Sequence, residues 1–157
     1  MNKPSHTELV SAFQPTLKQM EIFVATMKAR SKRSKIEILV VEDQPFSRQL
    51  LTGLLKQFYT VHAAADAREG WTSYLNYAPD IVMLDIELPD MDGNRLAKLI
   101  SSIDRLAYII LVTANNKIEY VQQAKEIQAK GFVVKPYSKD KILSVIQKFV
   151  SERNAKG

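Results

Sequence analysis

The sequence has no cysteine among its 157 residues. Disulfide bonds, thiol catalysis and thiolate metal sites are therefore excluded, which leaves carboxylates and the two histidines as candidate metal ligands. There is also no apolar run near the roughly 18 to 20 residues that a membrane span needs, and the polar N-terminus lacks the layout of a signal peptide. We therefore expect a cytoplasmic protein without membrane contact, in which any metal is a hard cation bound by oxygen.

Most of the chain carries no excess of positive charge, because the excess is confined to the first 35 residues. The formal net charge is +5, but residues 1–35 hold seven Lys and Arg against two Glu, so residues 36–157 are close to neutral. The basic segment Met27–Lys35 is polar and serine-punctuated just before the first strand-like run, which favours a domain boundary near residue 35. We predict a helical extension with a basic linker over residues 1–35 and one globular domain over residues 36–157. The linker should be solvated, so nucleic acid is not an expected partner.

The extension carries one amphipathic helical pattern. Apolar side chains recur at spacings of three and four, which predicts a helix running to about Arg30 with Pro15 in its first turn. The predicted stripe consists of Phe13, Leu17, Met20, Val24 and Met27, widened by Ile22 and Phe23. An isolated helix cannot leave such a face in water, so it should pack back on the domain, self-associate as a homodimer, or dock to a separate partner. Self-association or partner docking is favoured over packing on the domain.

From residue 36 onward, the sequence alternates five times between a strand pattern and a helix pattern. Short apolar runs predict strands at 38–41, 59–63, 81–85, 108–112 and 132–134. Between and after these strands, apolar residues recur at helical spacing, which predicts a helix after each strand. Gly131 is expected to cap the fourth of these helices and Ser138 to begin the last. This alternation with short links predicts an α/β fold: a five-stranded parallel sheet, doubly wound as in flavodoxin-like folds, plus the N-terminal helix.

Polar residues stand at the ends of four of these runs. Glu42-Asp43 follows the first run, Asp85 ends the third, Thr113 follows the fourth and Lys135 follows the fifth. Because parallel sheets bind ligands at the carboxyl ends of their strands, these side chains should converge on one edge. Three carboxylates crowded there repel one another and call for a divalent cation such as Mg²⁺, while the lysine and the hydroxyl suit a phosphoryl group.

These points belong to an ordered set of motifs on alternating strands. They are Glu42-Asp43, residues 85–93 with their Pro-x-Met-Asp-Gly turn, Thr113-Ala114 and Lys135-Pro136-Tyr137. Together they resemble the signature of receiver domains of two-component response regulators, over about residues 36–150. The resemblance implies a CheY-like phosphoprotein with Mg²⁺ as cofactor, which relays a phosphoryl group from a histidine kinase or histidine phosphotransfer protein and signals to a downstream protein target.

The resemblance also implies roles for the acidic residues. Asp85 would be the nucleophile that accepts the phosphoryl group. Asp43 and Asp85 would ligate Mg²⁺ through their side chains, Glu87 through its backbone carbonyl, and Glu42 mainly through metal-bound water. Glu87 and Asn115 would in addition flank the path of the hydrolytic water and tune the lifetime of the phosphorylated state.

The remaining motif residues would bind and report the phosphoryl group. By resemblance, Lys135 and the Thr113 hydroxyl would each bind a phosphoryl oxygen, and the peptide bond before Pro136 would be cis. Thr113 and an aromatic residue on the fifth strand, here Phe132, would form the switch that reshapes the surface. Phe has no hydroxyl to leave unsatisfied when buried, so we expect its inward state to be populated before phosphorylation.

The resemblance predicts a signalling protein and not an enzyme with an external substrate, since its catalysis is limited to its own phosphotransfer and autodephosphorylation. The chain ends shortly after the last predicted helix, so we expect a single-domain response regulator that acts by binding a partner. Two alternatives remain open. One is a receiver-like binding module that is never phosphorylated. The other is a Mg²⁺-dependent aspartyl-phosphate phosphatase of the haloacid dehalogenase type, which normally has a second Asp where this chain has Glu87.

Overall fold

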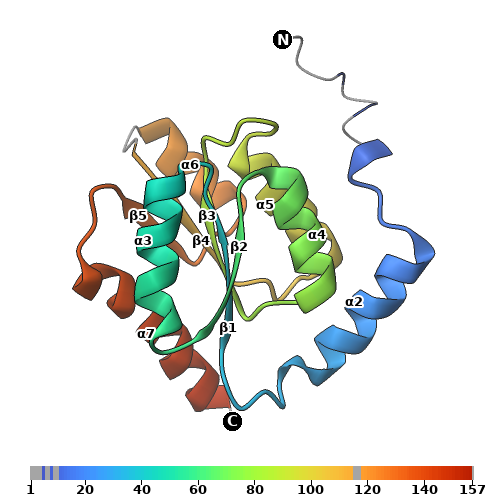
Figure 1. The fold of residues 1–157 in the computed structure, drawn as a ribbon, viewed down its shortest axis with the longest axis horizontal. Helices are drawn as coiled ribbons and strands as arrows, with labels where there is room; N and C mark the ends of the chain where they lie inside the picture. Colours follow the sequence, from blue (N-terminus) through green and yellow to red (C-terminus); the bar gives the residue numbers. More distant parts are fainter. Residues whose placement is uncertain (1–4, 6–7, 9–10, 115–117, 157) are drawn as a thin grey trace.

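The computed structural model describes residues 11–114 and 118–156, together with Ser5 and Glu8. Five parallel strands form one sheet in the order β2-β1-β3-β4-β5, and helices alternate with them along the chain (Figure 1). The strands are β1 Glu37–Val41, β2 Thr60–Ala64, β3 Ile81–Asp85, β4 Ile109–Thr113 and β5 Gly131–Val134. The helices are α2 Leu17–Arg30, α3 Pro45–Lys56, α4 Ala67–Tyr77, α5 Gly93–Ile103, α6 Ile118–Glu126 and α7 Lys139–Lys156. The predicted doubly wound α/β fold is confirmed.

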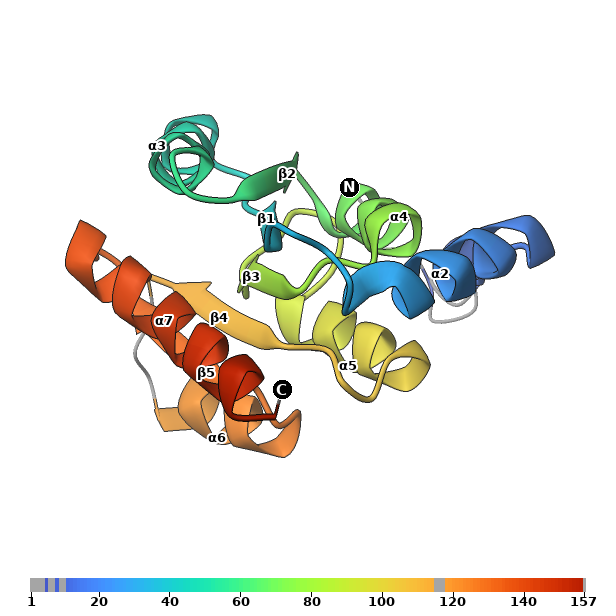
Figure 2. The same cartoon turned by 90° about the horizontal axis from the view of Figure 1, so that it is seen from below.

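The sheet is covered on both faces, as its nearly continuous apolar strands require. Residues of α3 and α7 pack on one face, and residues of α4, α5 and α6 pack on the other (Figure 2). The strands β3 and β4 are buried at every position. Neighbouring strands pair in register up to their last residues, with Asp85 opposite Val112 and Thr113 opposite Val134. The carboxyl ends of these strands therefore lie side by side.

Two helix ends differ from the prediction. The helix α6 ends at Glu126 and the backbone turns at Gln128, which has φ 57°, so Gly131 is the first residue of β5 and not a helix cap. The helix α7 continues to Lys156, beyond the last apolar side chains of its buried face. The polar residues of this final stretch carry no apolar spacing, which is why the sequence pattern placed the end of the helix too early.

The extension forms α2, which begins at a capping box. The Thr16 hydroxyl accepts a hydrogen bond from the backbone N–H of Gln19 at 3.1 Å, and the Gln19 side chain accepts one from the backbone N–H of Thr16 at 2.8 Å. Pro15 therefore precedes the helix and does not lie in its first turn. Phe13 also lies before the helix, where it is buried with its ring centroid 6.3 Å from that of Trp71 in α4.

The helix α2 packs on α4 through a face rotated from the predicted stripe. Phe23 is 1% exposed, and its ring centroid lies 5.9 Å from that of Tyr74. Met20 and Met27 pack against the same core, whereas Leu17 is 78% exposed. The preference for self-association or partner docking through this face was wrong for the buried residues, because the domain itself covers them.

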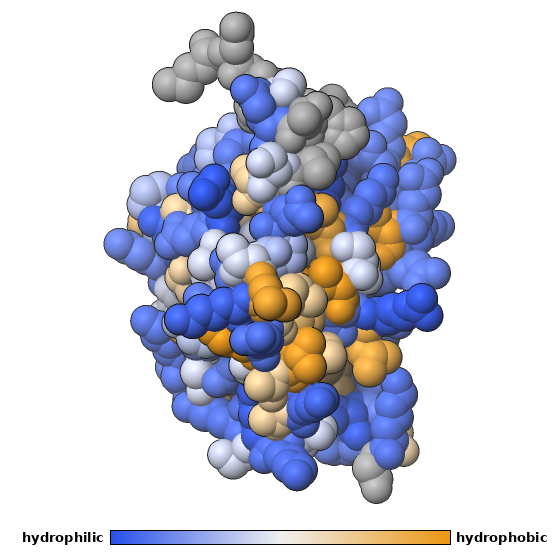
Figure 3. Space-filling view, turned by 90° about the vertical axis from the view of Figure 1, so that its right-hand side faces the viewer, coloured by the Kyte–Doolittle hydropathy of each residue, from blue (hydrophilic) through white to orange (hydrophobic). Residues whose placement is uncertain are grey.

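The outward side of α2 keeps some apolar surface. Leu17, Ile22 and Val24 are exposed on it. Figure 3 shows the side of the molecule that carries α2, where apolar side chains gather among charged ones. Among the described helices, none combines the length and the apolar character needed to cross a membrane.

Two arginines of the basic linker region are bound to the domain. Arg30 donates a hydrogen bond to Oδ2 of Asp104 at 2.6 Å, and the Tyr74 hydroxyl donates to the same oxygen at 2.6 Å. Although burial acts in the opposite direction, these hydrogen bonds lower the pKa of Asp104 below its ordinary value. Arg33 lies 3.4 Å from the carboxylate of Asp80. The prediction of a solvated linker is therefore wrong for both arginines.

Candidate functional site

Five polar residues meet at the carboxyl ends of four strands. Glu42 and Asp43 follow β1, Asp85 is the last residue of β3, Thr113 is the last residue of β4, and Lys135 follows β5. Because the strands are parallel and in register, the sheet brings all five to one edge, as the sequence predicted. Glu42, Asp85 and Thr113 are buried there.

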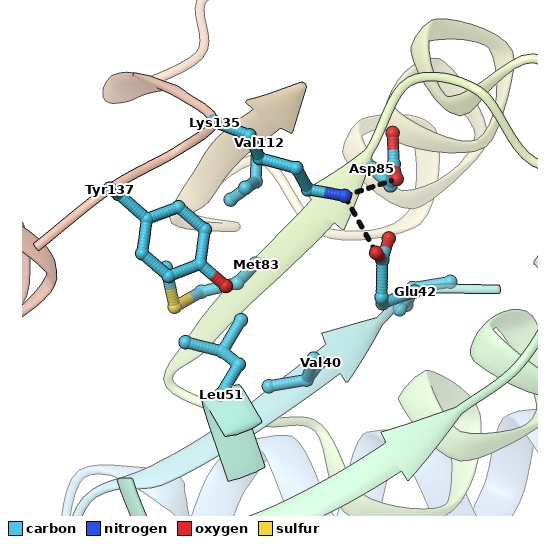
Figure 4. A pocket seen from close by; sticks show the side chains of 9 residues that line it. Val40, Glu42, Leu51, Met83, Asp85, Val112, Lys135 and Tyr137 are labelled. Atoms are coloured by element: carbon cyan, nitrogen blue, oxygen red, sulfur yellow. Dashed lines mark hydrogen bonds and ion pairs between the residues drawn. The ribbon is translucent and has the colours of Figure 1, made fainter. Parts of the chain in front are cut away.

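Lys135 bridges two of the carboxylates. Its Nζ lies 2.6 Å from Oε1 of Glu42 and 3.0 Å from Oδ2 of Asp85 (Figure 4). Burial disfavours the charge of this ammonium group, but the two hydrogen bonds outweigh burial and raise the pKa of Lys135 above its ordinary value. The lysine is therefore a fixed positive charge beside Asp85.

The three carboxylates are close enough to share one cation. Oxygens of Glu42, Asp43 and Asp85 lie within 4.8 Å of one another. Burial and the neighbouring Asp85 raise the pKa of Glu42 to about 7 although Lys135 acts in the opposite direction, and Oε2 of Glu42 is buried without a hydrogen-bond partner in the described part of the chain. Hard oxygen ligands with an unsatisfied oxygen fit a divalent cation such as Mg²⁺, which would offset their mutual repulsion.

The loop after β3 is held tightly against the strand end. The backbone N–H of Glu87 donates to Oδ1 of Asp85 at 3.0 Å, while the Glu87 side chain is exposed. Gly93 donates its backbone N–H to the carbonyl of Ile86 at 2.7 Å. A Cβ atom at Gly93 would lie 2.1 Å from the backbone oxygen of Asp85, so only glycine fits where this loop passes the strand. The Met-Asp-Gly turn thus fixes the backbone around Asp85.

The predicted switch and cis-proline residues flank the site. The peptide bond between Lys135 and Pro136 is cis, as predicted. The carbonyl of Thr113 accepts a hydrogen bond from the backbone N–H of Lys135 at 2.8 Å, which joins β4 to the segment that carries the lysine. Phe132 is half-buried against the core shared with α4, α5 and α6. Its switch role stays a prediction, and Asn115 lies outside the described residues.

Sequence reasoning missed Arg48, which supports the acidic pair. Its guanidinium donates to the carbonyl of Glu42 at 2.9 Å and to the carbonyl of Asp43 at 3.3 Å. These two bonds hold the backbone between β1 and α3. A basic residue in the first turns of the helix after the acidic pair was the available signal, but no spacing rule distinguishes it from a surface arginine.

A second missed residue is Asp90, whose carboxylate joins the site loop to α4. Its oxygens accept the backbone N–H groups of Ala67 at 2.8 Å and Arg68 at 3.0 Å. These are free donors of the first helical turn, where a negative charge is favourable. The loop that contains Asp90 is therefore attached to the helix on which the extension packs.

Comparison with known proteins agrees with this geometry. The sequence profile described as response regulator receiver domain matches residues 38–147. The chemotaxis protein CheY of Bacillus subtilis is 35% identical over 113 residues, which cover 71% of this chain and 94% of that protein. A CheY-like receiver domain protein from Methanospirillum hungatei has a TM-score of 0.75 at 26% identity and covers 79% of this chain and 100% of its own. CheY in the CheX-CheY-BeF3-Mg complex from Borrelia burgdorferi has a TM-score of 0.68 at 32% identity, covering 72% of this chain and 87% of its own. The chain therefore belongs to the response regulator receiver domains of two-component signalling systems.

Proposed function

We propose that this receiver accepts a phosphoryl group on Asp85 from a histidine kinase or a histidine phosphotransfer protein, and that it signals by phosphorylation-dependent binding to a downstream protein. The observation that carries the proposal is the setting of the Asp85 carboxylate. Its Oδ2 lies 3.0 Å from the Lys135 ammonium, and its Oδ1 accepts the Glu87 backbone N–H at 3.0 Å. The oxygens of Glu42 and Asp43 stand beside it.

The groups around Asp85 suit phosphoryl transfer. An oxygen of Asp85 forms a bond to phosphorus while the phosphorus–nitrogen bond of the donor phosphohistidine breaks, and the leaving imidazole keeps the electron pair and takes up a proton. The transition state is loose and spreads negative charge over the equatorial oxygens, so positioning and electrostatics dominate. Lys135 would bind one of these oxygens and the Thr113 hydroxyl another.

The acidic residues would hold Mg²⁺ for this step. Asp43 and Asp85 would ligate it through their side chains and Glu87 through its carbonyl, while Glu42 would act through bound water. When bound, the ion would neutralise charge on the carboxylates and on the phosphoryl oxygens. The CheY of Borrelia burgdorferi forms a complex with CheX, BeF3 and Mg²⁺, which supports proposing a metal and a protein partner here.

The output would depend on Thr113 and Phe132. Thr113 would move toward the phosphoryl group and Phe132 would turn inward, which changes the surface around β5. We expect two interconverting conformers of Phe132 before phosphorylation. Relaxation-dispersion NMR on the unphosphorylated protein tests this, and a single conformer without exchange at β5 contradicts it.

The phosphoacceptor is tested with acetyl phosphate and Mg²⁺. Intact-mass spectrometry should show one added phosphoryl group on the wild type, none on Asp85→Asn, and none after chelation of Mg²⁺. Asp140→Asn is the matched control, because it makes the same change at an exposed carboxylate outside the acidic cluster, and it should still be labelled. Labelling that survives in Asp85→Asn would overturn the assignment of the site.

The same samples separate the two alternatives. A wild type that is labelled neither by acetyl phosphate nor by a phosphorylated histidine protein would be a binding module only. Sustained release of phosphate from an added phosphomonoester, lost in Asp85→Asn, would indicate a phosphatase. The proposed receiver instead stops after one phosphoryl group per chain and then dephosphorylates itself.

A further inference from the structure

A cavity of about 510 Å³ lies at the edge of the sheet remote from Asp85. Its lining residues Asp80, Tyr108 and Lys130 directly precede β3, β4 and β5, so the cavity stands at the amino ends of the strands. A strand of five residues separates the two edges by about 16 Å. Figure 2 looks at the molecule from below, where the end of α2, the end of α7 and the loop between α5 and β4 meet.

One wall of the cavity is apolar and aromatic. Met27 of α2 lines it together with Ala107, Tyr108 and Phe149. The rings of Tyr108 and Phe149 pack edge to face with their centroids 5.0 Å apart. The Tyr108 hydroxyl is buried and has no hydrogen-bond partner among the described residues. The volume falls in the range of about 300 to 1,000 Å³ that is typical of small-molecule sites, and the wall suits a flat apolar body.

The polar part of the lining is mainly cationic. Five basic and two acidic residues line the cavity: Arg30, Arg105, Lys130, Arg153 and Lys156 with Asp80 and Glu152. Arg30 is paired with Asp104 at 2.6 Å and Arg153 with Asp80 at 3.7 Å. The side chains of Arg105, Lys130 and Lys156 are exposed and make no ion pair with any described residue.

Helix dipoles explain only part of this charge. Arg30 lies in the last turn of α2, and Arg153 and Lys156 lie in the last turn of α7, where cations are favourable without any ligand. Arg105 and Lys130 stand in the loops that follow α5 and α6, and neither lies in the last turn of a helix. The favourable effect of a helix end falls off beyond its last turn, so it accounts for these two cations less well.

The cavity depends on the extension as much as on the receiver. Met27, Arg30 and Ser31 come from α2 and the turn after it, upstream of the region that matches the family profile. Ser31 accepts a hydrogen bond from Arg153 of α7 at 3.2 Å, which ties the two walls together. This site is consequently a property of this chain and not of a receiver domain alone.

We propose that the cavity binds a small organic anion, with a flat apolar body against Met27, Tyr108 and Phe149 and a carboxylate or phosphate group near Arg105 and Lys130. Burial of the body supplies apolar contact, and the two unpaired cations select for the negative group. Because both the extension and α7 contribute to the site, the bound anion stabilises the docked position of α2 by mass action. The site does not require phosphorylation of Asp85.

The test is an NMR titration of the full chain without Mg²⁺, using four probes: 1-naphthoate, 1-naphthyl phosphate, uncharged 1-naphthol and inorganic phosphate. At least one naphthyl anion should bind and shift the amide signals of Ser31, Ala107 and Tyr108. Naphthol and inorganic phosphate should each bind about tenfold more weakly, since each lacks one half of the contact. The stronger of the two anions tells whether the acidic group is a carboxylate or a phosphate.

Charge variants locate the site. Arg105→Gln with Lys130→Gln should weaken binding of the anion about tenfold and leave naphthol binding unchanged. Lys18→Gln with Lys141→Gln is the matched control, because it removes two exposed charges outside the cavity lining, and it should bind as the wild type does. Thermal melts check that both variants fold. The proposal is overturned if the control weakens binding equally, if naphthol binds as tightly as the anions, or if the shifts map elsewhere.

Discussion

The contact between Phe23 and Tyr74 sets how firmly the extension is held to the receiver. We expect Phe23→Ala to lower the free energy of unfolding by about 3–5 kcal/mol, since a fully buried aromatic ring is lost and a cavity remains. The residue is 1% exposed and its ring lies 5.9 Å from that of Tyr74. Val24→Ala is the matched control, because Val24 is the next residue of the same helix, is 36% exposed, and should cost no more than about 0.5 kcal/mol.

Urea unfolding followed by two probes measures this difference. Far-UV circular dichroism reports on the whole fold. Trp71, the single tryptophan, reports on the extension because its ring lies 6.3 Å from that of Phe13. With a urea dependence of about 1–3 kcal/mol/M, the expected loss in Phe23→Ala lowers the midpoint by about 1 to 5 M in both probes.

Two results would refute this reasoning. Equal midpoints for Phe23→Ala and Val24→Ala would mean that α2 is not docked on α4 in solution. In the wild type, a Trp71 transition well below the circular-dichroism transition would mean that the extension detaches separately. The measured cost of the substitution would then be limited to the free energy of docking.

Three further changes probe the site and its supports. Gly93→Ala should destabilise the protein by about 1–3 kcal/mol in chemical unfolding, because the added Cβ would meet the Asp85 backbone oxygen. Gly53→Ala is the control: its added Cβ would have no atom within 4 Å, so it should be neutral or stabilising by up to about 1 kcal/mol. The pKa of Asp104 is lower in the folded than in the unfolded protein, so its contribution to stability is present above its unfolded pKa of about 3.9 and is lost as the pH falls through the folded value. The difference in unfolding free energy between wild type and Asp104→Asn should therefore shrink below about pH 4. A difference that stays constant with pH contradicts this. Lys135→Ala removes the ammonium group that partly neutralises Glu42 and Asp85. Saturating Mg²⁺ should therefore raise the melting temperature more in this variant than in the wild type. A smaller rise in the variant would show that Lys135 does not compete with the metal for the same carboxylates.

The residues of the site could be predicted because a parallel sheet leaves little freedom. Asp85, Thr113 and Lys135 each end or follow a short apolar run, and parallel strands in register must bring such positions to one edge. Arg48 and Asp90 could not be predicted in the same way. Both bind backbone groups of other segments, and such partners are set by how loops and helices are placed and not by spacing along the chain.

The extension shows where periodicity is insufficient. Leu17, Met20 and Val24 satisfy helical spacing as well as Met20, Phe23 and Met27 do, so the pattern predicts a helix but not its rotation. Contact with Tyr74 selects the second set. The charges of the linker were misjudged for a similar reason, since the carboxylate that binds Arg30 is distant in sequence.

The ion pair between Arg30 and Asp104 means that the limits of the family are not the limits of the folding unit. Residues 38–147 match the family, yet the buried carboxylates of Asp104 and Asp80 are paired with arginines that lie upstream of it. A protein cut at residue 36 would lose Arg30 and Arg33, so Asp104 would keep the Tyr74 hydroxyl and Asp80 would keep Arg153, but neither would keep the arginine that the extension supplies. Trimming this receiver to the size of its relatives would therefore yield a weakened protein and not a minimal one.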